Sequence, residues 1–159
     1  MLMLAAGSFD FLIPEYRLRA EARRIGEHVR LAKGEALTTG QDVYIGYDLK
    51  KGTYWVWVWQ EVPEEQRSSG KPEFNWQTLF SSKLADGVQF VNVIYGQQKV
   101  VDSKTASVRV TPMGTADHHI VNLKAADGST MAVKLNGVTG VVTYYGQNIK
   151  QQDYLRESE

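Results

Sequence analysis

Arg17-Leu18-Arg19-Ala20-Glu21-Ala22-Arg23-Arg24-Ile25 and its continuation Val29-Arg30-Leu31-Ala32-Lys33-Gly34-Glu35-Ala36-Leu37 form the stretch that decides the fold. Apolar residues recur there at alternating intervals of four and three, which is the stripe of an amphipathic helix: Leu18, Ala22, Ile25, Val29, Ala32 and Ala36. The remaining positions are dense in charge, with opposite charges at helical spacing such as Arg17 and Glu21, and such a run usually forms a solvated face. The stretch predicts a stem helix over about 15–38, which Thr39-Gly40 ends.

After Gly40 the helical period disappears and short runs typical of β-strands follow. Turn residues such as Asp127-Gly128 and Asn136-Gly137 separate neighbouring runs and favour antiparallel hairpins. The polar, proline-containing segment 61–75 predicts an exposed loop. We therefore expect an α+β fold, with a long N-terminal α-helix packed on an antiparallel β-sheet domain over about 41–147. The expected strands are Val43–Asp48, Thr53–Gln60, Val88–Tyr95, Ala106–Thr111, His119–Ala125, Thr130–Leu135 and Val138–Tyr145.

Composition limits the possible functions. The length of 159 residues suits one globular domain. Because 18 basic residues balance 18 acidic ones, the chain has no net positive charge that would attract nucleic acid, and no nucleic-acid partner is expected. The absence of cysteine excludes disulfides, a thiol nucleophile and thiolate zinc sites.

The sequence carries no recognisable catalytic motif. It has no phosphate-binding glycine loop, nucleophile elbow or HExxH pattern, although a carboxylate pair assembled in three dimensions would escape this search. His118 and His119 follow Asp117, but adjacent strand residues point to opposite faces, which argues against a shared metal. We expect His28 to be a surface histidine. No catalytic, cofactor-binding or metal-binding residue is predicted, and the chain is not expected to be an enzyme.

Tyr54-Trp55-Val56-Trp57-Val58-Trp59 is the most unusual stretch. Period-two geometry places Trp55, Trp57 and Trp59 on one face of a strand. The favoured interpretation is structural: these side chains form the apolar face on which the helix packs, or the loop 61–75 partly covers them. The alternative is a glycan-stacking platform, which would make the chain a soluble β-rich glycan-binding module.

The order of the segments and their residue patterns resemble those of the GspH/FimT group of pilin-like minor pseudopilins. In that group a proline precedes a stem of the type R-L-R-x-x-A, and here Leu12-Ile13-Pro14 leads into the stretch that starts at Arg17. Val110-Thr111-Pro112-Met113-Gly114-Thr115-Ala116 is similar to the F-x-P-x-G-x-A turn of the group, and Val138-Thr139-Gly140-Val141-Val142 is similar to its closing T-G-x-V strand.

The resemblance implies a structural subunit of a type II secretion or type IV pilus-like filament, acting by assembly. Its implied partners are other pilin-like subunits, with secreted cargo as a further candidate. Its implied location is the inner membrane, single-pass in the full-length form, with the β-domain in the periplasm or outside the cell. The N-terminal third of the stem is expected to project from the domain and to bind partners through Phe11, Leu12, Leu18 and Ala22.

The first residues depart from that family's pattern. The group carries a motif of the G-F-T-L-x-E kind ahead of a complete membrane helix, whereas the apolar run at Met1–Gly7 is far shorter than the about 20 residues that a span requires. We expect segment 1–14 to be the remnant of a membrane-spanning helix whose start lies upstream of Met1. The truncated chain itself is expected to be soluble.

Overall fold

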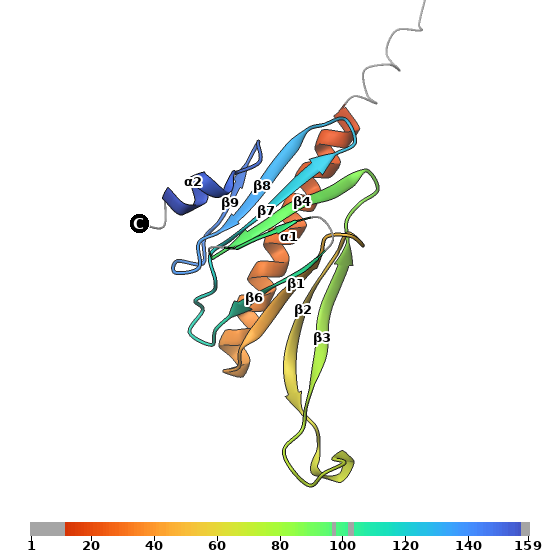
Figure 1. The fold of residues 1–159 in the computed structure, drawn as a ribbon, viewed down its shortest axis with the longest axis vertical. Helices are drawn as coiled ribbons and strands as arrows, with labels where there is room; N and C mark the ends of the chain where they lie inside the picture. Colours follow the sequence, from red (N-terminus) through yellow and green to blue (C-terminus); the bar gives the residue numbers. More distant parts are fainter. Residues whose placement is uncertain (1–11, 97, 102–103, 157–159) are drawn as a thin grey trace, which may run out of the picture.

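The fold consists of one long helix, two antiparallel sheets and a short C-terminal helix (Figure 1). This computed structural model describes residues 12–96, 98–101 and 104–156. Helix α1 spans Leu12–Thr39, and α2 spans Gln151–Arg156. Of the predicted remnant 1–14, residues 12–14 belong to α1 and the others lie outside the described residues. Within the described part of the chain, no helix is both long and apolar enough to cross a bilayer.

The first sheet has the strand order β3-β2-β1-β6, and the second has the order β5-β4-β7-β8-β9. Every paired neighbour is antiparallel. The α+β prediction is therefore confirmed. The strands are β1 (Val43–Asp48), β2 (Thr53–Glu61), β3 (Phe74–Lys83), β4 (Val88–Tyr95), β5 (Gln98–Val101), β6 (Thr105–Val110), β7 (His119–Ala125), β8 (Thr130–Leu135) and β9 (Val142–Tyr145), and a short 3-10 turn, η1 (Glu64–Gln66), lies between β2 and β3.

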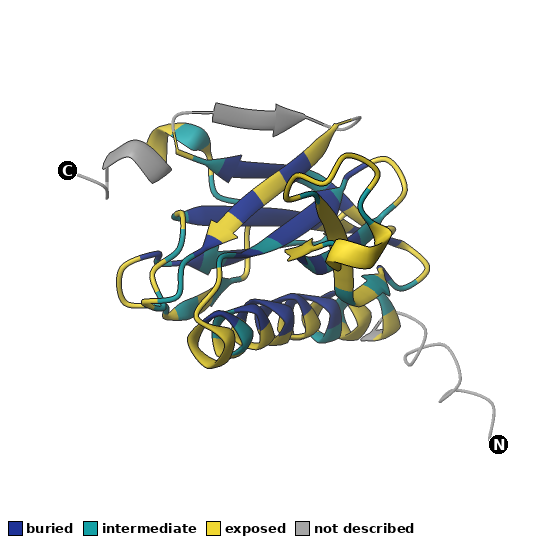
Figure 2. Cartoon of the chain, turned by 90° about the horizontal axis from the view of Figure 1, so that it is seen from below, coloured by how far each residue is buried: buried dark blue, intermediate teal, exposed yellow. Residues whose placement is uncertain are grey.

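Helix α1 packs across both sheets with its apolar stripe toward them (Figure 2). All six stripe residues from Leu18 to Ala36 are fully buried. The alanines at positions 22, 32 and 36 let the strands come close to the helix backbone. The inward side chains of the first sheet complete this core: Val43, Ile45, Tyr47, Tyr54, Val56, Val58, Ala106, Val108 and Val110.

Part of the charged side of α1 is also buried, which corrects two expectations. Glu21 is 2% exposed, and its carboxylate pairs with Arg24 at 2.6 Å and accepts a hydrogen bond from Tyr54 Oη at 3.4 Å. Burial raises the pKa of Tyr54 to about 12, so its hydroxyl stays protonated. His28, predicted at the surface, is 9% exposed because its ring packs edge-on against Tyr54 and its Nε2 lies 3.2 Å from Ser82 Oγ. The β2–β3 hairpin thus covers one flank of the helix.

Candidate interaction surfaces

The N-terminal end of α1 is the first candidate surface. Ile13 is 41% exposed and Tyr16 76% exposed, whereas Leu18 is fully buried. The expectation that Leu18 is uncovered is therefore wrong, and Ala22 is also buried in the core. Phe11 lies outside the described residues, and so does the side chain of Leu12. The exposed apolar residues that the structure places at this end are Ile13 and Tyr16.

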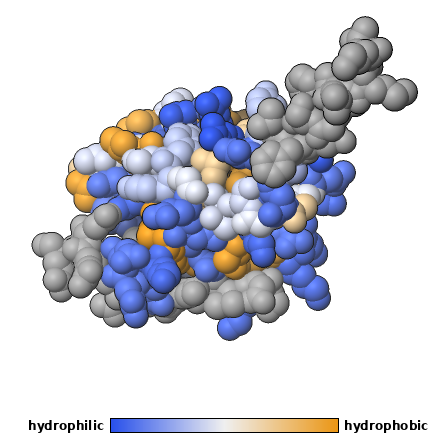
Figure 3. All heavy atoms as spheres, turned by 90° about the horizontal axis from the view of Figure 1, so that it is seen from above, coloured by the Kyte–Doolittle hydropathy of each residue, from blue (hydrophilic) through white to orange (hydrophobic). Residues whose placement is uncertain are grey.

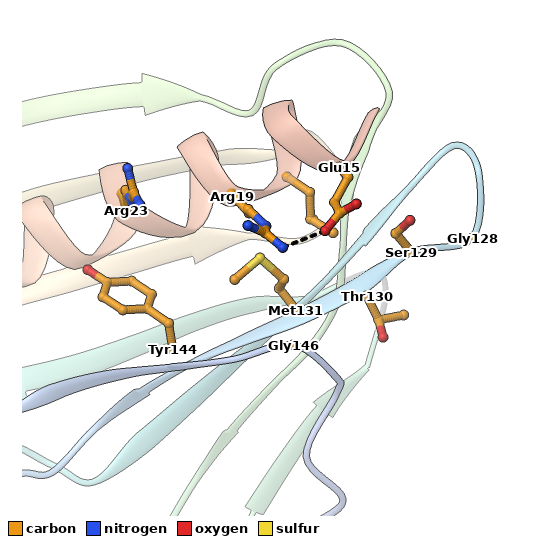
Figure 4. A pocket seen from close by; sticks show the side chains of 10 residues that line it. Glu15, Arg19, Arg23, Gly128, Ser129, Thr130, Met131, Tyr144 and Gly146 are labelled. Carbon is orange, nitrogen blue, oxygen red and sulfur yellow. Dashed lines mark hydrogen bonds and ion pairs between the residues drawn. The ribbon is translucent and has the colours of Figure 1, made fainter. Parts of the chain in front are cut away.

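A hollow of about 640 Å³ lies beside this end of the helix (Figure 4). Arg19 and Arg23 line it from α1, and Arg19 pairs with Glu15 at 2.6 Å. The opposite wall is formed by Ser129, Thr130 and Met131 of the β7–β8 hairpin, and by Tyr144 and Gly146. Seen from the end at which α1 begins, hydrophilic side chains predominate and apolar ones form small separate patches (Figure 3).

The tryptophans of β2 form the second candidate surface. Tyr54, Val56 and Val58 alternate with them and face the core, so Trp55, Trp57 and Trp59 lie on the outer side of the sheet. Trp55 and Trp57 are half-buried, and Trp59 is 47% exposed. The favoured prediction had two forms, and the first, in which these rings are the face on which the helix packs, is wrong. The second form, in which the segment 61–75 partly covers them, stays a prediction. Both faces of β2 are apolar, but Val and Tyr side chains occupy the face that the helix covers.

Strand β1 covers part of Trp55 and Trp57 from the side. Tyr44 lies opposite Trp57 and stacks on it, with ring centroids 4.3 Å apart and planes 16° apart. Gly46 lies opposite Trp55, and a Cβ at this glycine would overlap the indole ring. Small and flat residues on β1 therefore hold the two indoles in fixed positions.

Val43, the first residue of β1, pairs with Val58 of β2. The β2–β3 hairpin continues past this pair as two strands and extends away from the rest of the molecule, and we call this part the hairpin arm (Figure 1). On this two-stranded part Trp59 pairs with Trp76, and Glu61 pairs with Phe74. Trp76 is 62% exposed and Phe74 is 56% exposed. Directly paired residues of antiparallel strands share a face. The outer side therefore gathers six aromatic residues, which we call the aromatic face: Tyr44, Trp55, Trp57, Trp59, Phe74 and Trp76.

The histidines next to Asp117 have separate surroundings. His119 is buried, where its Nδ1 donates to the Asp117 carbonyl at 3.2 Å and its Nε2 accepts from Tyr47 Oη at 3.0 Å. His118 Nδ1 accepts a hydrogen bond from the Gly137 amide at 3.2 Å. Among the residues that the structure describes, no three side chains of the metal-binding types come together.

Three solved structures share this arrangement of helix and sheets. Two structures of the minor pseudopilin EpsH from the type 2 secretion system of Vibrio cholerae match with TM-scores of 0.56 and 0.62, at 13% and 14% identity. The matches cover 82% and 87% of this chain and 97% and 99% of those chains. The solution structure of E. coli GspH matches with a TM-score of 0.56 at 17% identity, over 89% of this chain and 95% of that one.

The chain has the fold of a minor pseudopilin. At these identities the likeness extends to the fold alone, and no protein-family model and no curated protein matches the sequence. Within the pseudopilin fold, sequence reasoning found Trp55, Trp57 and Trp59 but missed Tyr44, Phe74 and Trp76. The signal that could have found two of them was the alternation of Phe74 and Trp76 with Asn75 and Gln77.

Proposed function

We propose that this chain is a minor pseudopilin, a structural subunit of a type II secretion or type IV pilus-like filament that acts by assembly and not by catalysis. The observation that carries the proposal is the match to minor pseudopilins over most of this chain and nearly all of theirs. The exposed apolar residues at the start of α1 support it, because they mark a surface that a partner can cover.

Helix α1 has two parts in this proposal. The part from Leu18 to Ala36 anchors the helix in its own domain, because its apolar stripe is buried beneath both sheets. The part before Leu18, with Ile13 and Tyr16 exposed, packs against neighbouring pilin-like subunits. Phe11 and Leu12 belong to the same proposed partner surface. A membrane-spanning helix precedes this part and holds the subunit in the inner membrane, with the sheets in the periplasm or outside the cell.

The two sheets face away from the filament axis in this arrangement. The hairpin arm and its aromatic face lie on the first sheet, where they are accessible to a secreted cargo or to another minor subunit.

The direct test is to express the full-length tagged protein in its host and to shear, isolate and immunoblot the filaments. We expect the tagged protein in the sheared fraction, and crosslinked to pilin-like subunits in the membrane. As a control, a host that lacks the assembly ATPase should leave the protein in the membrane fraction. A protein that is found neither in filaments nor crosslinked to pilin-like subunits would contradict the proposal.

A further inference from the structure

We propose that the aromatic face binds a neutral oligosaccharide. This binding function is additional to the filament role and does not rest on it. The proposal starts from the exposure of large rings that could have been buried: Trp59, Phe74 and Trp76 are each 47% to 62% exposed. They extend the surface formed by Tyr44, Trp55 and Trp57 into one continuous face. Contiguous apolar surface of this kind on a folded domain marks a binding site.

The rings suit the flat side of a sugar. One side of a pyranose ring presents C–H bonds, and the negative π-face of an indole attracts such weakly positive hydrogens. The hydroxyl groups around the edge of the same sugar require hydrogen-bonding partners, because a polar group that is buried without one is costly. A sugar site therefore needs aromatic surface with uncharged polar groups beside it.

A groove of about 630 Å³ on this sheet has that composition. Trp55 and Trp76 contribute aromatic walls, and the hydroxyls of Thr53, Thr78 and Ser81 lie among its lining. Trp55 pairs with Ser81 and Trp57 with Thr78, so these hydroxyls lie on the same face as the indoles. The volume lies within the range of small-molecule sites, about 300–1,000 Å³.

The charge of the face favours a neutral ligand. Of the residues that line the groove, Lys83 alone is charged. Arg109, opposite Tyr44, pairs with Asp42 at 2.7 Å, and Glu61, opposite Phe74, pairs with Arg67 at 2.6 Å. An acidic polysaccharide would need a cluster of cations, and among the described residues that line this groove Lys83 is a single cation. Lys50 and Lys51 join Lys83 only around a neighbouring hollow. A neutral polyol matches both the hydroxyls and the scarcity of charged side chains in the lining.

The hairpin arm is fixed in shape before any ligand binds. An isolated two-stranded hairpin is marginally stable in water, so its loop needs internal contacts. Glu73 accepts hydrogen bonds from the backbone amides of Ser68 and Ser69 at 2.9 and 3.0 Å. Arg67 Nε donates to the carbonyl of Val62, which directly follows β2, at 2.8 Å and so ties the loop to the end of that strand. These bonds fix the end of the arm, and pre-formed sites bind with a smaller loss of entropy.

Tryptophan fluorescence tests the proposal cleanly, because all four tryptophans of the chain lie on this face. The protein should be titrated with cellohexaose and with hexa-N-acetylchitohexaose, which are both neutral, and with polygalacturonate as the anionic control. We expect a saturable change in emission with at least one neutral oligosaccharide and none with polygalacturonate. Trp76→Ala should weaken that binding about tenfold, whereas Trp76→Phe should retain most of it. Phe80→Ala is the matched control. Phe80 lies on β3 like Trp76, but it pairs with the inward Val56 and therefore lies on the opposite face of the sheet.

Two results would overturn the proposal. The first is no saturable change with either neutral oligosaccharide, and the second is unchanged affinity in both Trp76→Ala and Trp59→Ala. If the first result is accompanied by loss of a protein partner in Trp76→Ala, the face is a protein-binding surface. Thermal melting of each variant confirms that it is folded. Filament incorporation is measured separately, so failure of sugar binding leaves the filament proposal intact.

Discussion

The hydroxyl of Tyr144 on β9 lies against the backbone of Gly26 on α1, in the space that a Cβ at Gly26 would occupy. Val142 Cγ1 would be 3.3 Å from the same Cβ. A glycine in the middle of a helix is unfavourable by about 0.5–1 kcal/mol relative to alanine. The close approach of β9 accounts for its presence here, whereas a Cβ at Gly34 on the same helix would have no neighbour within 4 Å.

Alanine at these two glycines should therefore have opposite effects. Gly34→Ala should raise the free energy of unfolding by about 0.5–1 kcal/mol, because the helix gains a better helix former without a clash. Gly26→Ala should lower it by about 1–3 kcal/mol through overpacking. Urea denaturation followed by circular dichroism measures both changes.

The double variant Gly26→Ala, Tyr144→Phe tests whether the Tyr144 hydroxyl causes the loss of stability in Gly26→Ala. Removing the hydroxyl should restore part of the stability that Gly26→Ala loses, because Tyr144 Oη is the nearest atom to the added Cβ. Equal stabilisation by alanine at positions 26 and 34 would show that β9 does not pack on the helix in this way.

Side chains on the two faces of β2 should contribute differently to the free energy of unfolding, so replacing them with alanine should have different effects. Val56 is fully buried beneath α1, so Val56→Ala should cost about 2 kcal/mol. Trp59 is larger but 47% exposed on the hairpin arm, so Trp59→Ala should cost less than about 1 kcal/mol. Thermal denaturation of the two variants side by side measures the difference. A larger loss for Trp59→Ala would mean that the tryptophans face the core.

Buried His119 should make the domain sensitive to mild acid. Burial lowers the pKa of His119 to about 4, while the unfolded chain has the ordinary value of about 6.5. Between these values the unfolded state binds more protons, so stability falls as the pH falls from about 6.5 to 4. The loss due to this group should reach about 3 kcal/mol, and it should be measurable by denaturant titration across that range.

The variant His119→Gln separates this effect from carboxylate titration. Glutamine keeps hydrogen-bonding groups near Tyr47 Oη and the Asp117 carbonyl but does not titrate. The variant should be less stable near pH 7, and its stability should fall less steeply between about pH 6.5 and 4. Parallel pH profiles for the variant and the wild type would rule out a folded-state pKa near 4.

Local sequence patterns predicted the regular parts of this fold well. The apolar stripe from Leu18 to Ala36 identified the buried face of α1, because burial under two sheets leaves a strict helical period. The bounds of β1, β4, β7 and β8 agree with the prediction, because turn residues flank each strand closely. By contrast, β3 was missed. Its register with β2 shifts between Val56 and Trp57, so Leu79 and Phe80 are adjacent apolar residues and break the alternation.

The candidate surfaces were predicted less well, because they depend on tertiary contacts. Period-two geometry placed Trp55, Trp57 and Trp59 on one face, but it does not determine which face of an apolar strand the helix covers. The burial of Glu21 and His28 depends on Tyr54 and on Ser82 of the unpredicted strand β3.

The error at Leu18 has a simple geometric reason. A small domain about 30 Å across covers about 20 helical residues at about 1.5 Å each. Counted back from Leu37, that length reaches residue 17, so Leu18 lies inside the covered part of the helix, whereas the exposed Ile13 and Tyr16 lie before it.

The proposed division of α1, into a start that binds other subunits and a remainder that belongs to the core, can be tested with Tyr16→Glu and Leu18→Glu in the full-length protein. Both the thermal melting of the domain and the amount of protein in sheared filaments should be measured. Tyr16→Glu should leave melting nearly unchanged and abolish incorporation, because Tyr16 is 76% exposed. Leu18→Glu should destabilise the domain by at least about 3 kcal/mol, because it buries an unpaired carboxylate. Normal incorporation of Tyr16→Glu, or a stable and folded Leu18→Glu domain, would contradict this division of the helix.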